Sequence, residues 1–221
     1  MAVAPVNKFI TIAVPVAPGE QTIYSTPTGV SSIILYAQVS NVAAATTYPS
    51  VTFTHRRKSN KTGNIRNNRV IKGAKIPPND SLIIIDGRLV LERTAIVSDS
   101  VVIQGTQSGI VSVTNCLYNN NTGVTTVTTL TPHNFSAGDE ITMSGLAFTC
   151  SSGTTGITTT IYPYPQASFT VTSITGSVGT SLTFTTNTGV ISGIAHTYVS
   201  GGQVGPLQME FICSILENST V

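Results

Sequence analysis

The sequence predicts an all-β protein, and three observations carry this prediction. Charged residues make up only 9% of the 221 residues, and Ser, Thr, Asn and Gly fill their place. Short segments alternate apolar with polar residues along the whole chain, which is the pattern of half-buried strands. No segment keeps helical spacing with capping residues over three turns.

Seven strands are expected in the first part of the chain, with turn residues between them. In order they are KFITIAVP (8–15), QTIYST (21–26), SSIILYAQVSNV (31–42), SVTFTHR (50–56), NRVIKGAKI (68–76), SLIIIDGRLVL (81–91) and SVVIQGT (100–106). Successive side chains of a strand point to opposite faces of its sheet. This alternation predicts that one face of the third strand carries Ile33, Leu35, Ala37 and Val39.

The composition changes near Gly105. From residue 109 onward the chain is rich in Thr, Ser and Gly, with alternating segments at 109–118, 123–132, 140–149, 167–175 and 181–187. The strand LQMEFICSILENS (207–219) is as apolar as the strands of the first part, so we expect it to return there. We therefore predict a β-sandwich base domain, of jelly-roll or Ig-like type, formed by 1–108 plus 203–221. A small β-barrel or sandwich module is predicted as an insertion at 109–202.

One segment of the first part is unusually basic. THRRKSNKTGNIRNNR (54–69) contains Arg56, Arg57, Lys58, Lys61, Arg66 and Arg69. Gly63 and Asn64 tolerate positive φ, so we expect a β-hairpin with its cations on the solvent face and at the tip. Its charges are typical of a protected sheet edge. They also suit an arm that forms bidentate bonds with carboxylates of a neighbouring subunit.

Nucleic acid is not the expected partner of this hairpin, because no base-stacking aromatics accompany the cations. Non-specific contact with phosphates stays open. Charge is also divided along the chain: residues 1–93 hold all eleven basic and four acidic residues (+7), whereas residues 94–221 hold five acidic residues and no basic one (−5). This polarity suits head-to-tail contact between copies or an acidic partner.

No catalytic, cofactor or metal site is expected. The adjacent acids Asp139 and Glu140 follow a turn glycine and point to opposite faces of a strand, which does not suit paired acid/base catalysis. Asp139 is expected to bond the turn backbone. The three histidines lack metal-ligand spacing to Cys or acids; they are His55, His133 and His196. Nucleophile-elbow, phosphate-loop and dinucleotide motifs are absent.

The cysteines and the N-terminal segment bear on location. Cys116, Cys150 and Cys213 are an odd number without C-x-x-C spacing, which predicts reduced thiols in or near a core. MAVAPVNKFITIAVPVAPGE lacks a basic start, and its apolar run is interrupted. We expect neither a signal peptide nor a membrane span there, and no membrane attachment elsewhere.

Tyr162 and Tyr164 in IYPYPQ form a candidate exposed recognition loop, because their spacing points both rings the same way. Packing of the loop, a protein contact and a glycan platform all stay open for this pair.

At several of these segments the chain resembles structural proteins of tailed-bacteriophage virions. SSIILYAQVSN, VTFTHRR, KIPPNDSLIIIDGRLVLERTA and MEFICSILE are similar, in this order, to strands of small phage β-sandwich proteins. TTLTPHNFSAGDEITMSGLAF and PQASFTVTSIT resemble small repeated β-modules of phage fibres and other virion proteins.

The resemblance implies a non-enzymatic virion component, assembled in the host cytoplasm, that decorates or cements the capsid or belongs to the tail, neck or fibre. Its implied partners are major capsid or tail subunits and copies of itself, as a trimer or larger. The inserted module would project outward as a knob. The alternative is a module on a phage fibre that binds host-surface glycans or proteins.

Overall fold

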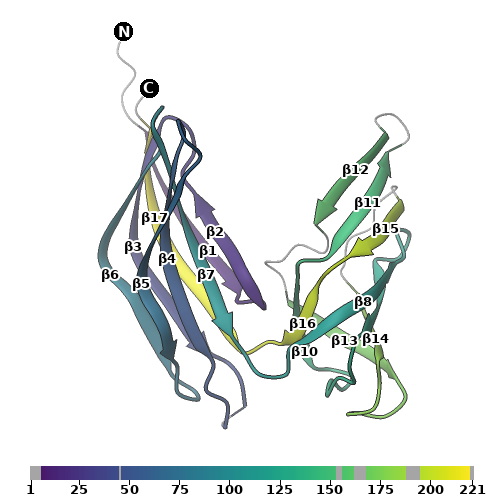
Figure 1. Cartoon of the computed structure of the whole chain (residues 1–221). Coiled ribbons are helices and arrows are strands. Elements are labelled where there is room, and N and C mark those ends of the chain that lie inside the picture. Colours follow the sequence, from purple (N-terminus) through teal and green to yellow (C-terminus); the bar gives the residue numbers. More distant parts are fainter. Residues whose placement is uncertain (1–5, 45, 153–155, 162–167, 188–194, 220–221) are drawn as a thin grey trace. The chain divides into compact units, whose positions relative to one another are not determined.

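The computed structural model describes residues 6–44, 46–152, 156–161, 168–187 and 195–219, and Figure 1 shows the course of the chain. Within these ranges every regular element is a β-strand, so the all-β prediction is confirmed. The chain divides into two compact units. The base unit comprises residues up to 16, 20–106 and from 208 onward, and the inserted unit comprises 17–19 and 107–207.

The base unit is a sandwich of two four-stranded sheets (Figure 1). One sheet has the order β1 (Val6–Pro15), β17 (Met209–Ser219), β3 (Val30–Asn41) and β6 (Ser81–Glu92). The other has the order β2 (Gly19–Ser25), β7 (Val97–Thr106), β4 (Ser50–Ser59) and β5 (Ile65–Lys75). Counted along the base unit, the strands follow the orders 1-8-3-6 and 2-7-4-5. This is the order of a jelly roll, not of an Ig-like sandwich.

The eighth strand of this jelly roll is β17, which pairs antiparallel with β1 on one side and β3 on the other. The chain therefore leaves the base unit after β7 and returns to it for β17. The side chains of β17 that point inward are Met209, Phe211, Cys213 and Ile215, as their alternation predicts. The Phe211 ring stacks on Phe53 of β4 with 5.8 Å between centroids, and this contact joins the two sheets.

The expected face of the third strand is wrong at one point. The pairing of β3 with both neighbours shifts between Ile34 and Tyr36, so Leu35 is an extra residue at a β-bulge. Because a bulge reverses the alternation, Ile34 lies in the core with Ala37 and Val39. Ile33 lies on the opposite, outer face.

The inserted unit contains a closed six-stranded barrel. Its strands, in order, are β8 (Val111–Tyr118), β16 (Gln203–Pro206), β10 (Glu140–Ser144), β13 (Ser168–Thr175), β14 (Thr183–Asn187) and β9 (Val124–Thr129). Pairing of β9 with β8 closes the barrel. The strands β15 (Ala195–Ser200), β11 (Ala147–Ser152) and β12 (Gly156–Ile161) continue the sheet beyond β8.

His133 belongs to the core of the barrel. Its ring stacks on Phe135 with centroids 4.9 Å apart and meets the edge of Phe184 at 5.3 Å. Burial lowers the pKa of His133, which favours the neutral ring. Cys116 is buried in the same core, and burial raises the pKa of its thiol to about 12; both Cys116 and Cys213 are free thiols. The side chain of Cys150 lies outside the described residues.

The described part of the chain holds no helix with the length and apolar character needed to cross a membrane.

Candidate interaction surfaces

The outer face of the β1-β17-β3-β6 sheet carries an apolar row that sequence reasoning missed. The register places four apolar residues side by side across all four strands: Phe9, Leu216, Ile33 and Val90. Phe9 is 74% exposed and Val90 is 50% exposed. Large exposed apolar side chains are ordinary when scattered, but a contiguous group of them indicates a contact surface.

A second row crosses the same face four residues along β1. It contains Ala13, Ile212, Gln38 and Ile83. The row between them is polar and contains Thr11, Ser214, Tyr36 and Asp86. We call the first row, together with Ala13, Ile212 and Ile83 of the second row, the apolar face.

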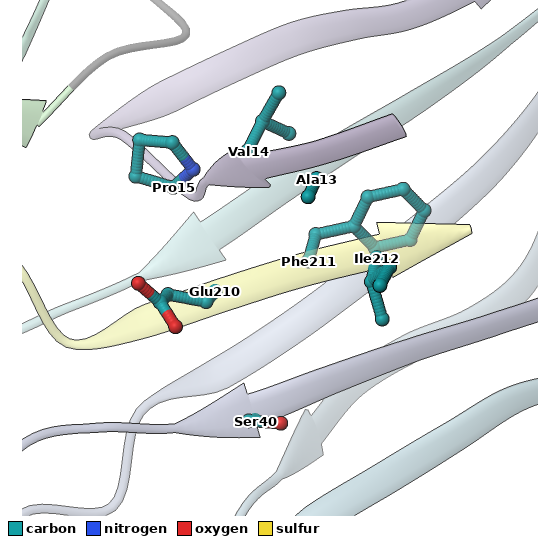
Figure 2. Close-up of a pocket in the computed structure, with 7 residues that line it drawn as sticks. All are labelled: Ala13, Val14, Pro15, Ser40, Glu210, Phe211 and Ile212. Carbon is teal, nitrogen blue, oxygen red and sulfur yellow. The ribbon is translucent and has the colours of Figure 1, made fainter. Parts of the chain in front are cut away.

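A hollow of about 290 Å³ lies at one end of the apolar face. Figure 2 shows residues of β1, β17 and β3 around it, with Glu210 and Ser40 toward one side and Ile212 toward the other. Pro15 and Ser40 are the register partners of Glu210 in β1 and β3. The hollow therefore combines an apolar wall with one carboxylate, as a socket for a side chain of another molecule would.

The predicted basic hairpin is present and lies at the edge of the other sheet. It consists of β4 and β5, and β5 is the last strand of this sheet among the described residues. β5 is exposed along most of its length, as expected of a strand at a sheet edge that uses charge to prevent unwanted pairing. Gly63 has φ of +73° at the tip, in agreement with the predicted turn.

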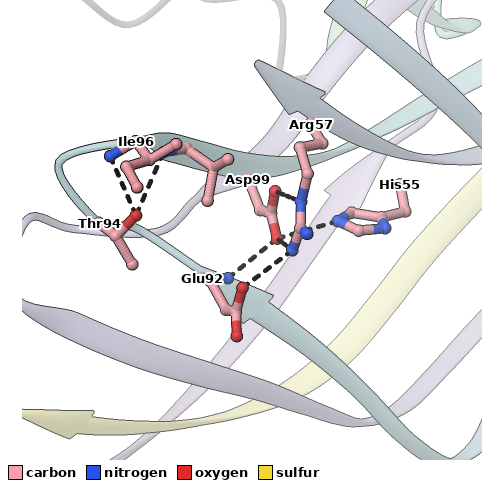
Figure 3. Close-up of polar contacts among 7 residues, drawn as sticks. His55, Arg57, Glu92, Thr94, Ile96 and Asp99 are labelled. Atoms are coloured by element: carbon pink, nitrogen blue, oxygen red, sulfur yellow. Dashed lines mark hydrogen bonds and ion pairs between the residues drawn. The ribbon is translucent and has the colours of Figure 1, made fainter. Parts of the chain in front are cut away.

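We expected all six cations of the hairpin to face solvent, but one of them, Arg57, does not. Arg57 lies directly opposite Asp99 of β7 on the inward face of the sheet. Its Nε and Nη2 donate to the two carboxylate oxygens of Asp99 at 2.8 and 2.7 Å (Figure 3). Arg57 Nη2 also lies 3.1 Å from Glu92 Oε2. This pairing could not be predicted from the sequence, because the two residues are 42 positions apart.

Asp99 is 1% exposed and gathers further donors. The backbone N–H of Glu92 donates to Oδ2 at 3.0 Å, and His55 Nε2 lies 3.1 Å from the same oxygen (Figure 3). Burial opposes ionisation of Asp99, but the hydrogen bonds from Arg57 and Glu92, together with the contact with His55, outweigh it and hold the pKa of this carboxyl below its ordinary value. The bond with Asp99 raises the pKa of Arg57. This buried cluster anchors the hairpin.

A turn beside the cluster fixes the hairpin tip. The Thr94 hydroxyl accepts hydrogen bonds from the N–H groups of Ile96 and Val97 (Figure 3). The side-chain amide of Asn60 donates to the Thr94 carbonyl, and the N–H of Asn60 donates to the Ile96 carbonyl. The tip is thus bonded to the β6–β7 turn at several points.

The remaining cations divide into one paired residue and four others. Arg56 Nη2 lies 2.7 Å from Glu20 Oε1, and its Nε donates to Asn67. Within the described ranges, no ion pair involves Lys58, Lys61, Arg66 or Arg69. These four are the cations left to meet an outside partner.

Several other expectations concern the inserted unit. The N–H of Ser136 donates to Asp139 Oδ2 at 2.8 Å, so the turn role expected for Asp139 is confirmed. Tyr162 and Tyr164 lie outside the described residues. No cluster of three His, Cys, Asp or Glu side chains with metal-binding geometry occurs in the described part of the chain.

The net charges of the two structural units differ from those of the two sequence segments, 1–93 and 94–221. Asp99, Glu210 and Glu217 are acidic residues of the second segment that lie in the base unit. The base unit therefore has eleven basic and seven acidic residues (+4), and the inserted unit has two acidic residues and no basic one (−2). The base unit is still net positive and the inserted unit net negative, but their net charges differ less than those of the two sequence segments.

No family model matches the chain, and no curated protein matches it. Among solved structures it is similar to the T13 viral particle of infectious bursal disease virus, with 11% identity, a TM-score of 0.33, and coverage of 100% of this chain and 40% of that chain. The tandem CBM22 domain of Paenibacillus barcinonensis Xyn10C gives 11% identity, a TM-score of 0.23 and coverage of 100% and 93%. The STIV MCP gives 8% identity, a TM-score of 0.23 and coverage of 99% and 97%.

The chain spans less than half the length of the infectious bursal disease virus chain. These identities and TM-scores are too low to carry a functional argument, so the jelly-roll assignment rests on strand order alone.

Proposed function

We propose that this protein is a non-enzymatic structural component of a virus particle and acts through contacts between subunits. The observation that carries the proposal is the apolar face on the outside of a jelly-roll sheet. Jelly rolls are common in viral capsid domains and in lectins, and fold alone does not decide between them. The three aliphatic members of the row, Leu216, Ile33 and Val90, favour a protein contact, because sugars are bound by polar groups and flat aromatic rings.

We infer that a second copy of the same chain covers the apolar face. Three strand spacings and four residues of β1 each span about 14 Å, so the two rows and the polar row between them cover roughly 200 Å². A standard interface buries about 800 Å² on each partner and has an apolar centre with a polar rim. The apolar face would therefore form about a quarter of one partner's side of such an interface. The resemblance to tailed-phage proteins supports placing the assembly in a capsid decoration, tail, neck or fibre layer.

The basic hairpin supplies a second contact in this proposal. Lys58, Lys61, Arg66 and Arg69 would meet carboxylates of a neighbouring capsid or tail subunit. Because exposed ion pairs are screened by salt, this contact weakens as ionic strength rises, whereas burial of the apolar face does not.

The test is the molar mass from light scattering after size-exclusion chromatography, at about 50 mM and about 500 mM NaCl. We expect a trimer or larger assembly. Ile212→Lys should dissociate it, because an unpaired charge in the centre of an interface is strongly unfavourable. Leu130→Lys is the matched control, because Leu130 is an exposed apolar residue of the inserted unit.

A wild-type monomer at all accessible concentrations, or equal masses for wild type and Ile212→Lys, would overturn the self-assembly proposal. Binding of the monomer to glycans or host cells would favour the alternative, a host-surface binding module.

A further inference from the structure

A second cavity lies in the base unit, away from the apolar face. It has a volume of about 210 Å³. It is lined by Ser25, Thr26, Arg56, Lys58, Ile65, Arg93, Ser98, Asp99 and Ser100. These residues come from the end of β2, the basic hairpin, the β6–β7 turn and β7. The cavity therefore lies where four chain segments meet, and we call it the basic pocket.

The register shows how the pocket is built. Lys58 lies opposite Ser98 and Arg56 lies opposite Ser100, all at outward-facing positions of the β4–β7 pair. Both cations thus lie on β4, and each faces a serine on the neighbouring strand β7. These residues line one cavity and place an ammonium, a guanidinium and the Ser100 hydroxyl around it, which are donor types that oxyanions require. The Ser98 hydroxyl already donates to Asn60 Oδ1 at 3.1 Å.

The charges around the pocket leave a positive excess. Arg56 shares its charge with Glu20, and Asp99 is already neutralised by its bidentate bond with Arg57. Lys58 has no ion pair in the described part of the chain. Arg93 has none either, and its Nη1 donates to the Thr26 carbonyl at 3.2 Å, which holds the side chain at the pocket.

An independent observation comes from Thr26. Its side chain is buried, yet its hydroxyl has no hydrogen-bond partner among the described residues. The backbone of Thr26 is fixed, since its N–H donates to the Asp99 carbonyl. A buried hydroxyl without a partner is unfavourable, and a bound anion that accepts its proton would remove that cost.

We propose that the basic pocket binds a phosphate-type oxyanion. Its volume corresponds to about seven water molecules at roughly 30 Å³ each, which suits a phosphate group but not an attached sugar and base. The anion is therefore either free inorganic phosphate or one phosphodiester of a nucleic acid whose remainder lies outside. This inference does not depend on the proposed assembly, because the pocket lies within one base unit.

The experiment is a titration of the isotope-labelled full chain with inorganic phosphate, followed by amide NMR shifts at constant ionic strength. We expect saturable shifts at Ser98 and Ser100 at millimolar phosphate. The double variant Lys58→Ser/Arg93→Ser should weaken binding at least about tenfold. The control Lys72→Ser/Lys75→Ser removes the same charge from the same base unit and should change affinity less than about twofold.

A third variant, Thr26→Val, keeps the charge and shape of the site but removes the hydroxyl. We expect phosphate affinity to fall about three- to tenfold while the protein stays folded. A titration with a ten-residue oligothymidylate identifies the source of the anion. If the anion belongs to a nucleic acid, the oligothymidylate binds more tightly than phosphate does. The Lys58→Ser/Arg93→Ser variant then reduces the slope of log K against log[salt] for the oligothymidylate by about 1.4.

Phosphate binding without oligonucleotide binding supports the pocket and assigns a free anion to it. Absence of saturable shifts at Ser98 and Ser100, or equal weakening by the two double variants, overturns the proposal. Loss of the assembly without loss of phosphate binding would count against the proposed function only.

Discussion

Arg57 of β4 and Asp99 of β7 form a bidentate ion pair between the two central strands of their sheet, at directly opposite register positions. The carboxylate is buried and the guanidinium is partly exposed. A cation of the exposed-looking basic segment therefore serves as the counter-charge of a buried acid. The same segment is both a structural anchor at Arg57 and a free cationic surface beyond it.

We expect Asp99→Ala to lower the free energy of unfolding by about 2–4 kcal/mol, because it leaves Arg57 and the N–H of Glu92 without their shared acceptor. The value lies below the upper range for fully buried pairs because the Arg57 side chain is 38% exposed. Urea denaturation measures it. Arg69→Ala is the control: Arg69 is an exposed cation of the same hairpin, and its loss should change stability by less than about 0.5 kcal/mol. Equal effects of the two variants would contradict a structural role for the pair.

The same pair predicts a dependence of stability on pH. The pKa of Asp99 is lower in the folded protein than the ordinary value of about 3.9, so the unfolded chain binds more protons as the solution is acidified. The stabilisation is complete above about pH 5 and is lost as pH falls through the ordinary value toward the folded pKa. Urea midpoints of wild type and Asp99→Asn should therefore converge below about pH 4. A constant difference between them down to about pH 2 would exclude this linkage.

The sequence predicted those features that depend on neighbouring residues. Gly63 and Asn64, with alternation on both sides, were enough to predict the basic hairpin. The apolar character of LQMEFICSILENS was enough to predict a strand there. These patterns are local, and the structure keeps them.

Features that depend on pairing between distant strands were not predictable from one sequence. The apolar row requires the register of Phe9, Leu216, Ile33 and Val90 across four strands, and each strand alone shows only an ordinary alternation. The bulge at Leu35 puts Ile33 on the opposite face of β3 from Ala37 and Val39, because one extra residue changes the parity of every residue after it. Arg57 was expected on the solvent face because its partner Asp99 lies on β7, and the hairpin sequence alone does not identify that partner.

Close packing at the end of the inserted barrel predicts a large effect of one methyl group. Gly202 has φ of +105°, and a Cβ there would overlap Cδ2 and Cγ of the buried Leu146. We expect Gly202→Ala to destabilise the inserted unit by about 2–4 kcal/mol, from backbone strain and overpacking together. Gly176→Ala is the matched control, because Gly176 has φ of +97° in the same unit but nothing within 4 Å of the added Cβ. Strain alone should cost it about 1–2 kcal/mol.

Hydrogen exchange of the Val113 amide, which donates to the Gly202 carbonyl at 3.0 Å, measures this local effect even when the two units unfold separately. Protection of that amide should fall about tenfold more in Gly202→Ala than in Gly176→Ala, since the midpoints of the two expected costs differ by about 1.5 kcal/mol and about 1.4 kcal/mol corresponds to a factor of ten. Equal protection in the two variants would mean that Leu146 moves aside at no cost. The core around Leu146 would then be less tightly packed than the buried Phe148 and Met143 beside it in the sequence indicate.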